Sequence, residues 1–124
     1  MNAFLTATGR VILGLYFLVP GAMKFIAWDM HVGLMQHHGL PFIPVLLALA
    51  GAVEVVLGLA LIVNRFTGVS ALVLAALVIA INLTLHDFWN FEGVERAHEL
   101  QNFIKNTGIF GGLLALAGFS LRRA

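Results

Sequence analysis

Four long apolar segments, separated by shorter polar connections, constrain this sequence more than any other feature. They cover about residues 4–23, 44–63, 67–85 and 103–121. A helix needs about 20 mostly apolar residues to cross the hydrocarbon core of a bilayer. The segments are too continuously apolar, and the chain is too short, for a transmembrane β-barrel. The sequence therefore predicts one all-α domain, residues 1–124, that forms an integral membrane bundle of four transmembrane helices.

The composition supports a place in the lipid bilayer and excludes several other classes of protein. The chain has 60% hydrophobic and only 10% charged residues, whereas soluble domains carry about 25% charged residues. Its formal net charge is +1, and no basic run is long enough to bind nucleic acid. It has no cysteine, which excludes disulfides, thiolate metal sites and a dithiol relay within the chain. Redox chemistry would therefore need a bound cofactor, a quinone or a partner.

The three connections between the spans differ in character. Residues 64–66 form a tight turn, which predicts that the second and third spans are antiparallel neighbours. Residues 24–43 are amphipathic, and we expect a short interfacial helix on the membrane surface there. Residues 86–102 carry aromatic side chains that suit the headgroup region, namely Phe88, Trp89 and Phe91.

The distribution of cations predicts the orientation of the bundle. Lysine and arginine are enriched on the cytoplasmic side of membrane proteins. The side with both termini has four of them (Arg10, Arg65, Arg122 and Arg123) and the opposite side has three (Lys24, Arg96 and Lys105). We therefore expect both termini in the cytoplasm. No basic region precedes the first apolar residues, so we interpret the N-terminal segment as a retained span rather than a signal peptide.

Two ionisable residues fall inside the first two spans. Helical spacing places Arg10 on one face with Gly14, Phe17, Gly21 and Lys24, and places Glu54 on one face with Gly51 and Gly58. Counted from the cytoplasmic edge, Arg10 lies about 9 Å deep and Glu54 about 13 Å deep. We therefore predict an Arg10–Glu54 ion pair. Such a pair could only fix which helices face each other, or it could belong to a polar cavity that binds a head group or relays a proton through Glu54.

A second group of polar residues is expected at one depth on the outer side. Its members are Lys24, His86, Asp87, Asn102 and Lys105. Together they could hold a quinone carbonyl or a small anion, with a histidine that changes charge near neutral pH. They could equally form a solvated interface with snorkelling lysines. In the fourth span, Gly108 and Gly112 have GxxxG spacing and predict close helix packing. The histidines at positions 31, 37 and 38 show no metal-ligand spacing, so no metal site is predicted.

Four stretches carry a family likeness. The sequences GRVILGLYFLVPGAMKF, GLPFIPVLLALAGAVEVVLGLALI, HDFWNFEG and FIKNTGIFGGLLAL together resemble the DoxX family of small bacterial membrane proteins, over about residues 7–118. The resemblance implies a four-helix protein of the bacterial inner membrane. It also implies kinship with subunits of thiosulfate:quinone oxidoreductase and with proteins of thiol, sulfur or quinone stress. Residues that match the family pattern are Arg10, Gly14, Gly21, Lys24, Glu54, Gly58, His86, Asp87, Phe88, Lys105, Asn106, Gly111 and Gly112.

These observations favour a membrane subunit that binds a quinone or another small redox-active molecule in a polar intramembrane pocket. The expected ligand-binding residues are Arg10, Lys24, Glu54, His86, Asp87, Asn102 and Lys105. Glu54 and His86 are the candidate catalytic residues, because they would handle protons. Oxidoreductase activity would need a partner redox subunit, and the glycine stripes would also allow a homo-oligomer. The alternatives are a non-catalytic anchor that recruits a partner enzyme and a small permease.

Overall fold

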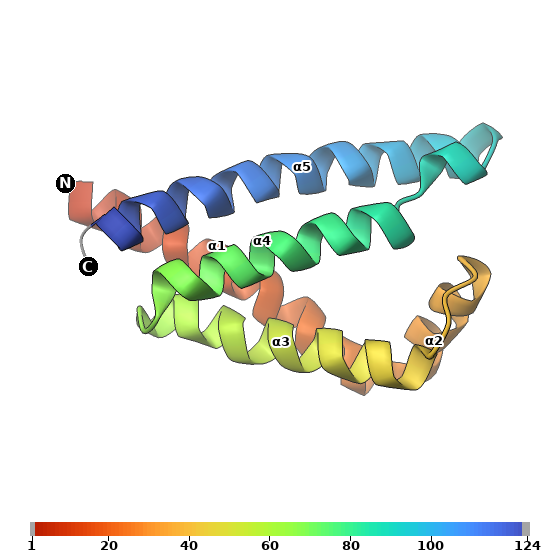
Figure 1. Cartoon of the computed structure of the whole chain (residues 1–124), viewed down its shortest axis with the longest axis horizontal. Coiled ribbons are helices and arrows are strands. Elements are labelled where there is room, and N and C mark those ends of the chain that lie inside the picture. Colours follow the sequence, from red (N-terminus) through yellow and green to blue (C-terminus); the bar gives the residue numbers. More distant parts are fainter. Residues whose placement is uncertain (1, 123–124) are drawn as a thin grey trace.

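The computed structural model describes residues 2–122 as an assembly of helices (Figure 1). Four of its helices are long and apolar enough to cross a membrane, which confirms the prediction of an all-α membrane protein. Arg123, used above for the orientation, lies outside the described residues. The elements in chain order are α1 (Asn2–Ile26), α2 (Trp28–His37), α3 (Ile43–Val63), α4 (Thr67–Thr84), the 3-10 helix η1 (Phe88–Asn90) and α5 (Gly93–Arg122).

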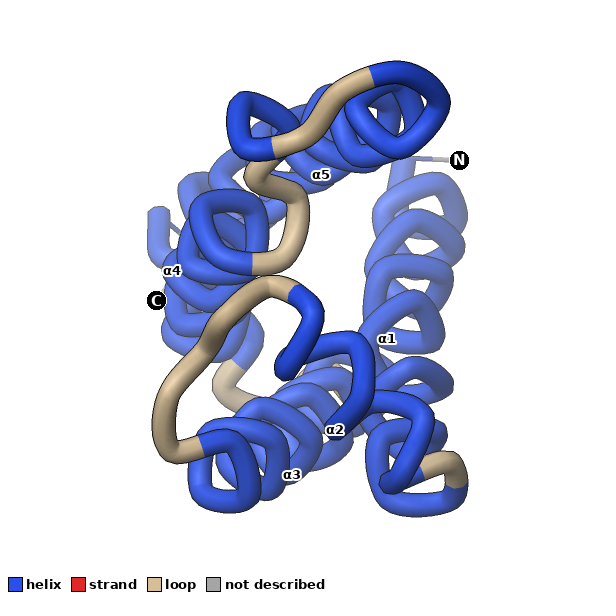
Figure 2. The backbone as a smooth tube through the Cα atoms, turned by 90° about the vertical axis from the view of Figure 1, so that its right-hand side faces the viewer, coloured by secondary structure: helices blue, strands red, loops and turns tan. Residues whose placement is uncertain are grey.

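The four long helices form two antiparallel pairs, α1 with α3 and α4 with α5, and α3 is joined to α4 by a tight turn (Figure 1). The short helix α2 follows the first span, as predicted, and lies across the near end of the bundle in Figure 2. Its place at the membrane surface stays a prediction. The start of α1 and the end of α5 are both at the opposite end (Figure 1).

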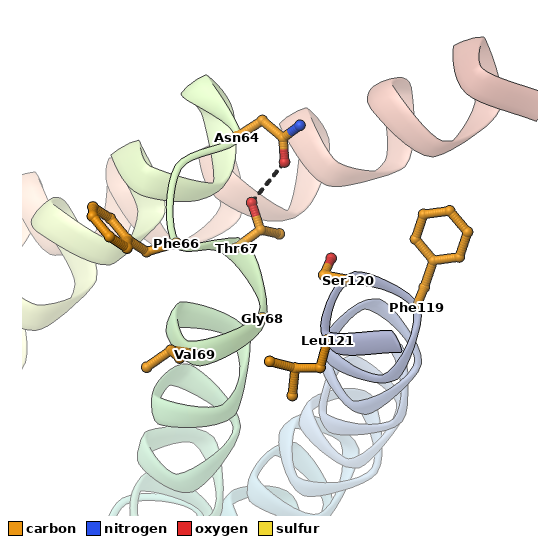
Figure 3. Close-up of a pocket in the computed structure, with 8 residues that line it drawn as sticks. All are labelled: Asn64, Phe66, Thr67, Gly68, Val69, Phe119, Ser120 and Leu121. Atoms are coloured by element: carbon orange, nitrogen blue, oxygen red, sulfur yellow. Dashed lines mark hydrogen bonds between the residues drawn. The ribbon is translucent and has the colours of Figure 1, made fainter. Parts of the chain in front are cut away.

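The turn between α3 and α4 is made by backbone in the left-handed region. Asn64 has φ of 58° and Phe66 has φ of 53°, and asparagine tolerates this region better than most residues. The Thr67 hydroxyl donates to Asn64 Oδ1 at 2.7 Å (Figure 3). Leu121 of α5 packs against Gly68, where an added Cβ would lie 2.6 Å from the leucine side chain. The Thr67–Asn64 hydrogen bond and the contact of Leu121 with Gly68 therefore stabilise the turn. The expected antiparallel arrangement of α3 and α4 is confirmed.

Glycines bring α1 and α3 into close contact, as the spacing of the stripes indicated. A Cβ on Gly14 would lie 2.7 Å from the Gly58 carbonyl oxygen, and a Cβ on Gly58 would lie 2.8 Å from the Leu18 nitrogen. Any side chain there would push the two backbones apart. Close backbone approach is the usual way in which helices associate in lipid, because hydrocarbon offers no hydrophobic drive between them.

The core lies between α4 and its neighbours, and it is built from Phe17, Leu61, Ala71, Leu74, Ala75, Val78, Leu113 and Ala117. Many large apolar side chains remain exposed on the outer surface, including Phe42, Val45 and Ile104. An apolar outer surface suits a chain whose surroundings are lipid tails.

The fourth span differs from its prediction in two ways. It begins at Gly93 instead of about residue 103, because its first turns are too polar to register as an apolar window. The predicted close packing at Gly108 and Gly112 is wrong within the described chain, because an added Cβ at either glycine would meet nothing within 4 Å. α5 packs through Leu113 and Ala117 instead. At about 100° per residue, the two glycines lie at least about 100° around the helix from Leu113.

Candidate functional site

A buried ion pair joins α1 to α3. Lys24 comes from the last turn of α1, and its Nζ lies 2.8 Å from Glu54 Oε1 in the middle of α3. Glu54 is only 3% exposed. An isolated charge in the membrane costs at least about 2.5–3.5 kcal/mol on insertion scales, so each ion lowers the cost of burying the other. Gly21 makes room for the pair, because a Cβ there would lie 2.7 Å from the Glu54 Cβ.

Arg10 does not pair with Glu54, so that prediction is wrong. Its Nη1 donates to the carbonyl oxygens of Leu61 at 2.6 Å and Ile62 at 2.9 Å. These carbonyls lie in the last turn of α3, where acceptors lack a full set of helical partners and a cation is favoured by the helix dipole.

The register of the two helices explains the error. Gly14 lies against Gly58, which places Arg10 beside the end of α3. Glu54 is seven residues before Leu61, or about 11 Å away along the helix axis. The depth of a residue counted from the edge of its own span does not show how far α1 and α3 are shifted along each other. The predicted depths of Arg10 and Glu54 therefore did not contain this offset.

Lys24 and Glu54 line a polar pocket of about 270 Å³ between the helices. Two more of the predicted residues, His86 and Lys105, line the same pocket. The structure therefore brings together four residues from four different segments of the sequence. The complete lining of this polar pocket is Tyr16, Phe17, Pro20, Lys24, Glu54, Val78, Ile81, His86, Lys105 and Asn106.

Tyr16 and Asn106 line the pocket but are not among the predicted ligand-binding residues, although Asn106 is one of the residues that match the family pattern. The Tyr16 hydroxyl donates to Asn106 Oδ1 at 2.9 Å, and Lys105 Nζ lies 5.9 Å from the centre of the tyrosine ring. Two signals could have found them. Tyr16 is the only tyrosine of the chain, and Asn106 is a polar residue within the fourth apolar window. Both sites therefore break the apolar pattern of their spans.

Asp87 and Asn102, the other two predicted residues, lie in a neighbouring cluster and not in the lining of the polar pocket. Asp87 Oδ1 lies 2.6 Å from His38 Nδ1, and the Asn90 amide donates to Asp87 Oδ2 at 2.8 Å. Asn102 donates to Glu99 Oε1 at 3.5 Å. We call this group the outer cluster; its members are His38, His86, Asp87, Asn90, Glu99 and Asn102.

Glu99 connects the outer cluster to the polar pocket. Its Oε1 lies 3.1 Å from Nδ1 of His86, which lines the pocket. Its Oε2 lies 3.1 Å from His38 Nε2, although these two atoms are not aligned for a hydrogen bond. The cluster thus ties the segment after α2 to the start of α5. Among residues 2–122, no three His, Asp or Glu side chains are grouped so that they could hold a metal ion.

The comparison with protein families matches residues 5–87 to DoxX, which is about two thirds of the chain. The chain belongs to the DoxX family. The matched residues include Lys24, Glu54 and His86 of the polar pocket, whereas the DoxX match ends before the α5 residues Lys105 and Asn106. Neither the curated proteins nor the solved structures contain a match to this DoxX protein.

The chemistry available in the pocket of this DoxX protein is that of hydrogen bonding and proton exchange. A lysine ammonium has three donors, and Glu54 occupies only one donor direction of Lys24. Lys105 and His86 add further nitrogen atoms to the same lining. The carboxylate of Glu54 can accept a hydrogen bond or a proton. The pocket therefore offers both donors and an acceptor to a small molecule with oxygen atoms.

Proposed function

We propose that this DoxX protein binds a quinone, or a small redox-active molecule with similar oxygen atoms, in the polar pocket. The observation that carries the proposal is the buried Lys24–Glu54 ion pair at the wall of a cavity of about 270 Å³. An ion pair that only fixed two helices would not need a cavity beside it. Intramembrane ionisable residues usually mark a ligand or proton site.

The size of the cavity supports a single-ring head group as the ligand. Pockets that enclose a drug-sized molecule measure about 300–1,000 Å³, and this one lies just below that range. In our proposal, Lys24 and Lys105 donate to a quinone oxygen. Glu54 and His86 exchange protons with the bound molecule, which is the role expected of general acids and bases.

The cellular setting is part of the same proposal. The family resemblance supports the bacterial inner membrane, and the lysine and arginine bias supports cytoplasmic termini. Because the chain has no cysteine, it supplies no dithiol to carry electrons. We therefore propose that a partner redox subunit completes any oxidoreductase reaction.

Binding of a short-chain quinone analogue to the purified protein in nanodiscs tests the proposal. Glu54→Gln keeps the shape of the side chain but removes its charge, and we expect it to weaken binding about tenfold, as the loss of one charged contact does. Ser120→Ala, in the last turn of α5 and outside the lining of the polar pocket, is the matched control and should bind like the wild type. Circular dichroism and gel filtration verify that both variants fold.

The outcomes separate the candidate functions. Equal affinity in the wild type and Glu54→Gln would remove the pocket proposal and leave a membrane anchor as the better account. Movement of a solute across liposomes by the chain alone would favour a permease instead.

A further inference from the structure

An open groove runs between α1 and α5, the first and last spans. It has a volume of about 610 Å³ and is lined by residues within the range 5–13 of α1 and 105–119 of α5. Each of these helices packs mainly on a different neighbour, α1 on α3 and α5 on α4. Along α5, the groove extends from Lys105 to Phe119, which corresponds to about 21 Å of helix.

The groove is apolar and unobstructed along α5. Gly108, Ile109, Gly112 and Ala115 contribute its floor, and a Cβ at either glycine would meet nothing within 4 Å. Arg10 also borders the groove, but its guanidinium is bonded to the carbonyls of α3. The space therefore suits hydrocarbon better than a polar ligand.

Lys105 lines both the groove and the polar pocket. The two spaces therefore adjoin at one exposed, flexible side chain. The pocket is lined by charged residues and has room for a head group, whereas the groove is mostly apolar and larger. This division between a polar end and an apolar extension corresponds to the two parts of a membrane amphiphile.

We propose that the groove holds the hydrocarbon tail of the ligand whose head group occupies the polar pocket, and that this ligand enters sideways from the bilayer. The inference rests on the proposed function and narrows it: the ligand is a long-chain lipid-soluble molecule with an oxygen-bearing head. A second apolar cleft of about 410 Å³, between α3 and α4, adjoins the pocket at Ile81. It is smaller than the groove, and the branched apolar side chain of Ile81 lies at the junction instead of an exposed lysine.

Two quinone analogues with the same head group, one with a short tail and one with a long isoprenoid tail, test the proposal in nanodiscs. Gly112→Leu fills the groove, Gly111→Leu places the same side chain on α5 outside the groove, and Ala76→Leu fills the α3–α4 cleft. Both glycines have open space for a side chain, so the two variants form a matched pair.

We expect Gly112→Leu to weaken binding of the long-chain analogue about tenfold, which corresponds to about two methylene groups forced out of the groove. Its affinity for the short-chain analogue should stay within about twofold of the wild type. Gly111→Leu and Ala76→Leu should bind both analogues like the wild type.

Several results would overturn the tail site alone while leaving the pocket intact. These are an unchanged long-chain affinity in Gly112→Leu, an equal loss in Gly111→Leu, or a loss confined to Ala76→Leu, which would place the tail in the other cleft. A wild-type dimer that Gly112→Leu converts to a monomer, with ligand affinity unchanged, would assign the groove to a second copy. Failure of the wild type to bind the short-chain analogue would instead overturn the proposed function, and the tail site with it.

Discussion

The hydroxyl of Tyr16 donates to Asn106 Oδ1 at 2.9 Å and so joins α1 to α5 at the wall of the polar pocket. The two helices belong to different antiparallel pairs. The bond therefore connects the α1–α3 pair to the α4–α5 pair at the polar pocket that Lys24 and Glu54 also line.

Removal of this hydrogen bond should loosen the bundle. We expect Tyr16→Phe to lower the free energy of unfolding by about 1 kcal/mol, within the range measured for hydrogen bonds between membrane helices. Thr8→Val is the control, because the exposed Thr8 hydroxyl donates to Phe4 O of its own helix and not to another helix among residues 2–122. Unfolding in mixed micelles measures both. Equal effects of the two substitutions would contradict a bond between the two halves.

The Lys24–Glu54 ion pair should show strong coupling in a double-mutant cycle. Lys24→Met or Glu54→Gln alone leaves one buried charge without its counter-charge, and each should cost about 3 kcal/mol of unfolding free energy. The loss of unfolding free energy in the double variant should be smaller than the sum of the two single losses, by at least about 1 kcal/mol. Strictly additive effects would show that the two charges do not interact.

Arg10 should matter for stability and not for binding of a head group. Arg10→Met removes two hydrogen bonds from a charged donor to the end of α3, and we expect a loss of about 2 kcal/mol of unfolding free energy. Its affinity for a short-chain quinone analogue should match the wild type, because Arg10 is not in the lining of the polar pocket. If Arg10→Met lost as much short-chain affinity as Glu54→Gln, Arg10 would act together with Glu54 at the binding site. That result would contradict the structure, in which the two residues do not pair.

The outer cluster should hold the connections at its end of the bundle. His38 is buried between Asp87 and Glu99. His38→Ala therefore removes the hydrogen bond with Asp87 and the contact with Glu99. We expect faster amide hydrogen exchange in residues 38–42 and 86–91, measured by mass spectrometry. His98→Ala is the control, because the His98 side chain is 71% exposed and its contact with Glu99, 4.0 Å long, is an exposed ion pair of the kind that contributes little. Unchanged exchange in His38→Ala would contradict an anchoring role.

The spans were predictable because the thickness of a bilayer fixes the length of an apolar helix. The start of α5 was not, since residues 93–102 are polar and form a helix through tertiary contacts such as those of Glu99. An apolar window cannot detect such a segment. The family was also predictable from the sequence motifs, and the match of residues 5–87 to DoxX confirms it.

The partners of the charged residues were only partly predictable. Lys24, Glu54, His86 and Lys105 are candidate ligand-binding residues in the sequence, and the structure places them around one pocket. Their pairing depended on the register between α1 and α3, which the distances from the span ends do not determine. The glycines do determine it, because close backbone contact is allowed only where Gly14 meets Gly58 and Gly21 meets Gly51.

Photolabelling can locate the head group of a bound quinone analogue at the polar pocket. A quinone analogue with a photoreactive group on its ring is bound to the protein in nanodiscs and irradiated, and the labelled residues are identified by mass spectrometry. We expect labels on α1 near Tyr16 and on α5 near Lys105. Excess unlabelled short-chain analogue should prevent this labelling, and Glu54→Gln should reduce it. Labels confined to the outer surface, or labels that competitor and Glu54→Gln leave unchanged, would contradict a head-group site at the polar pocket.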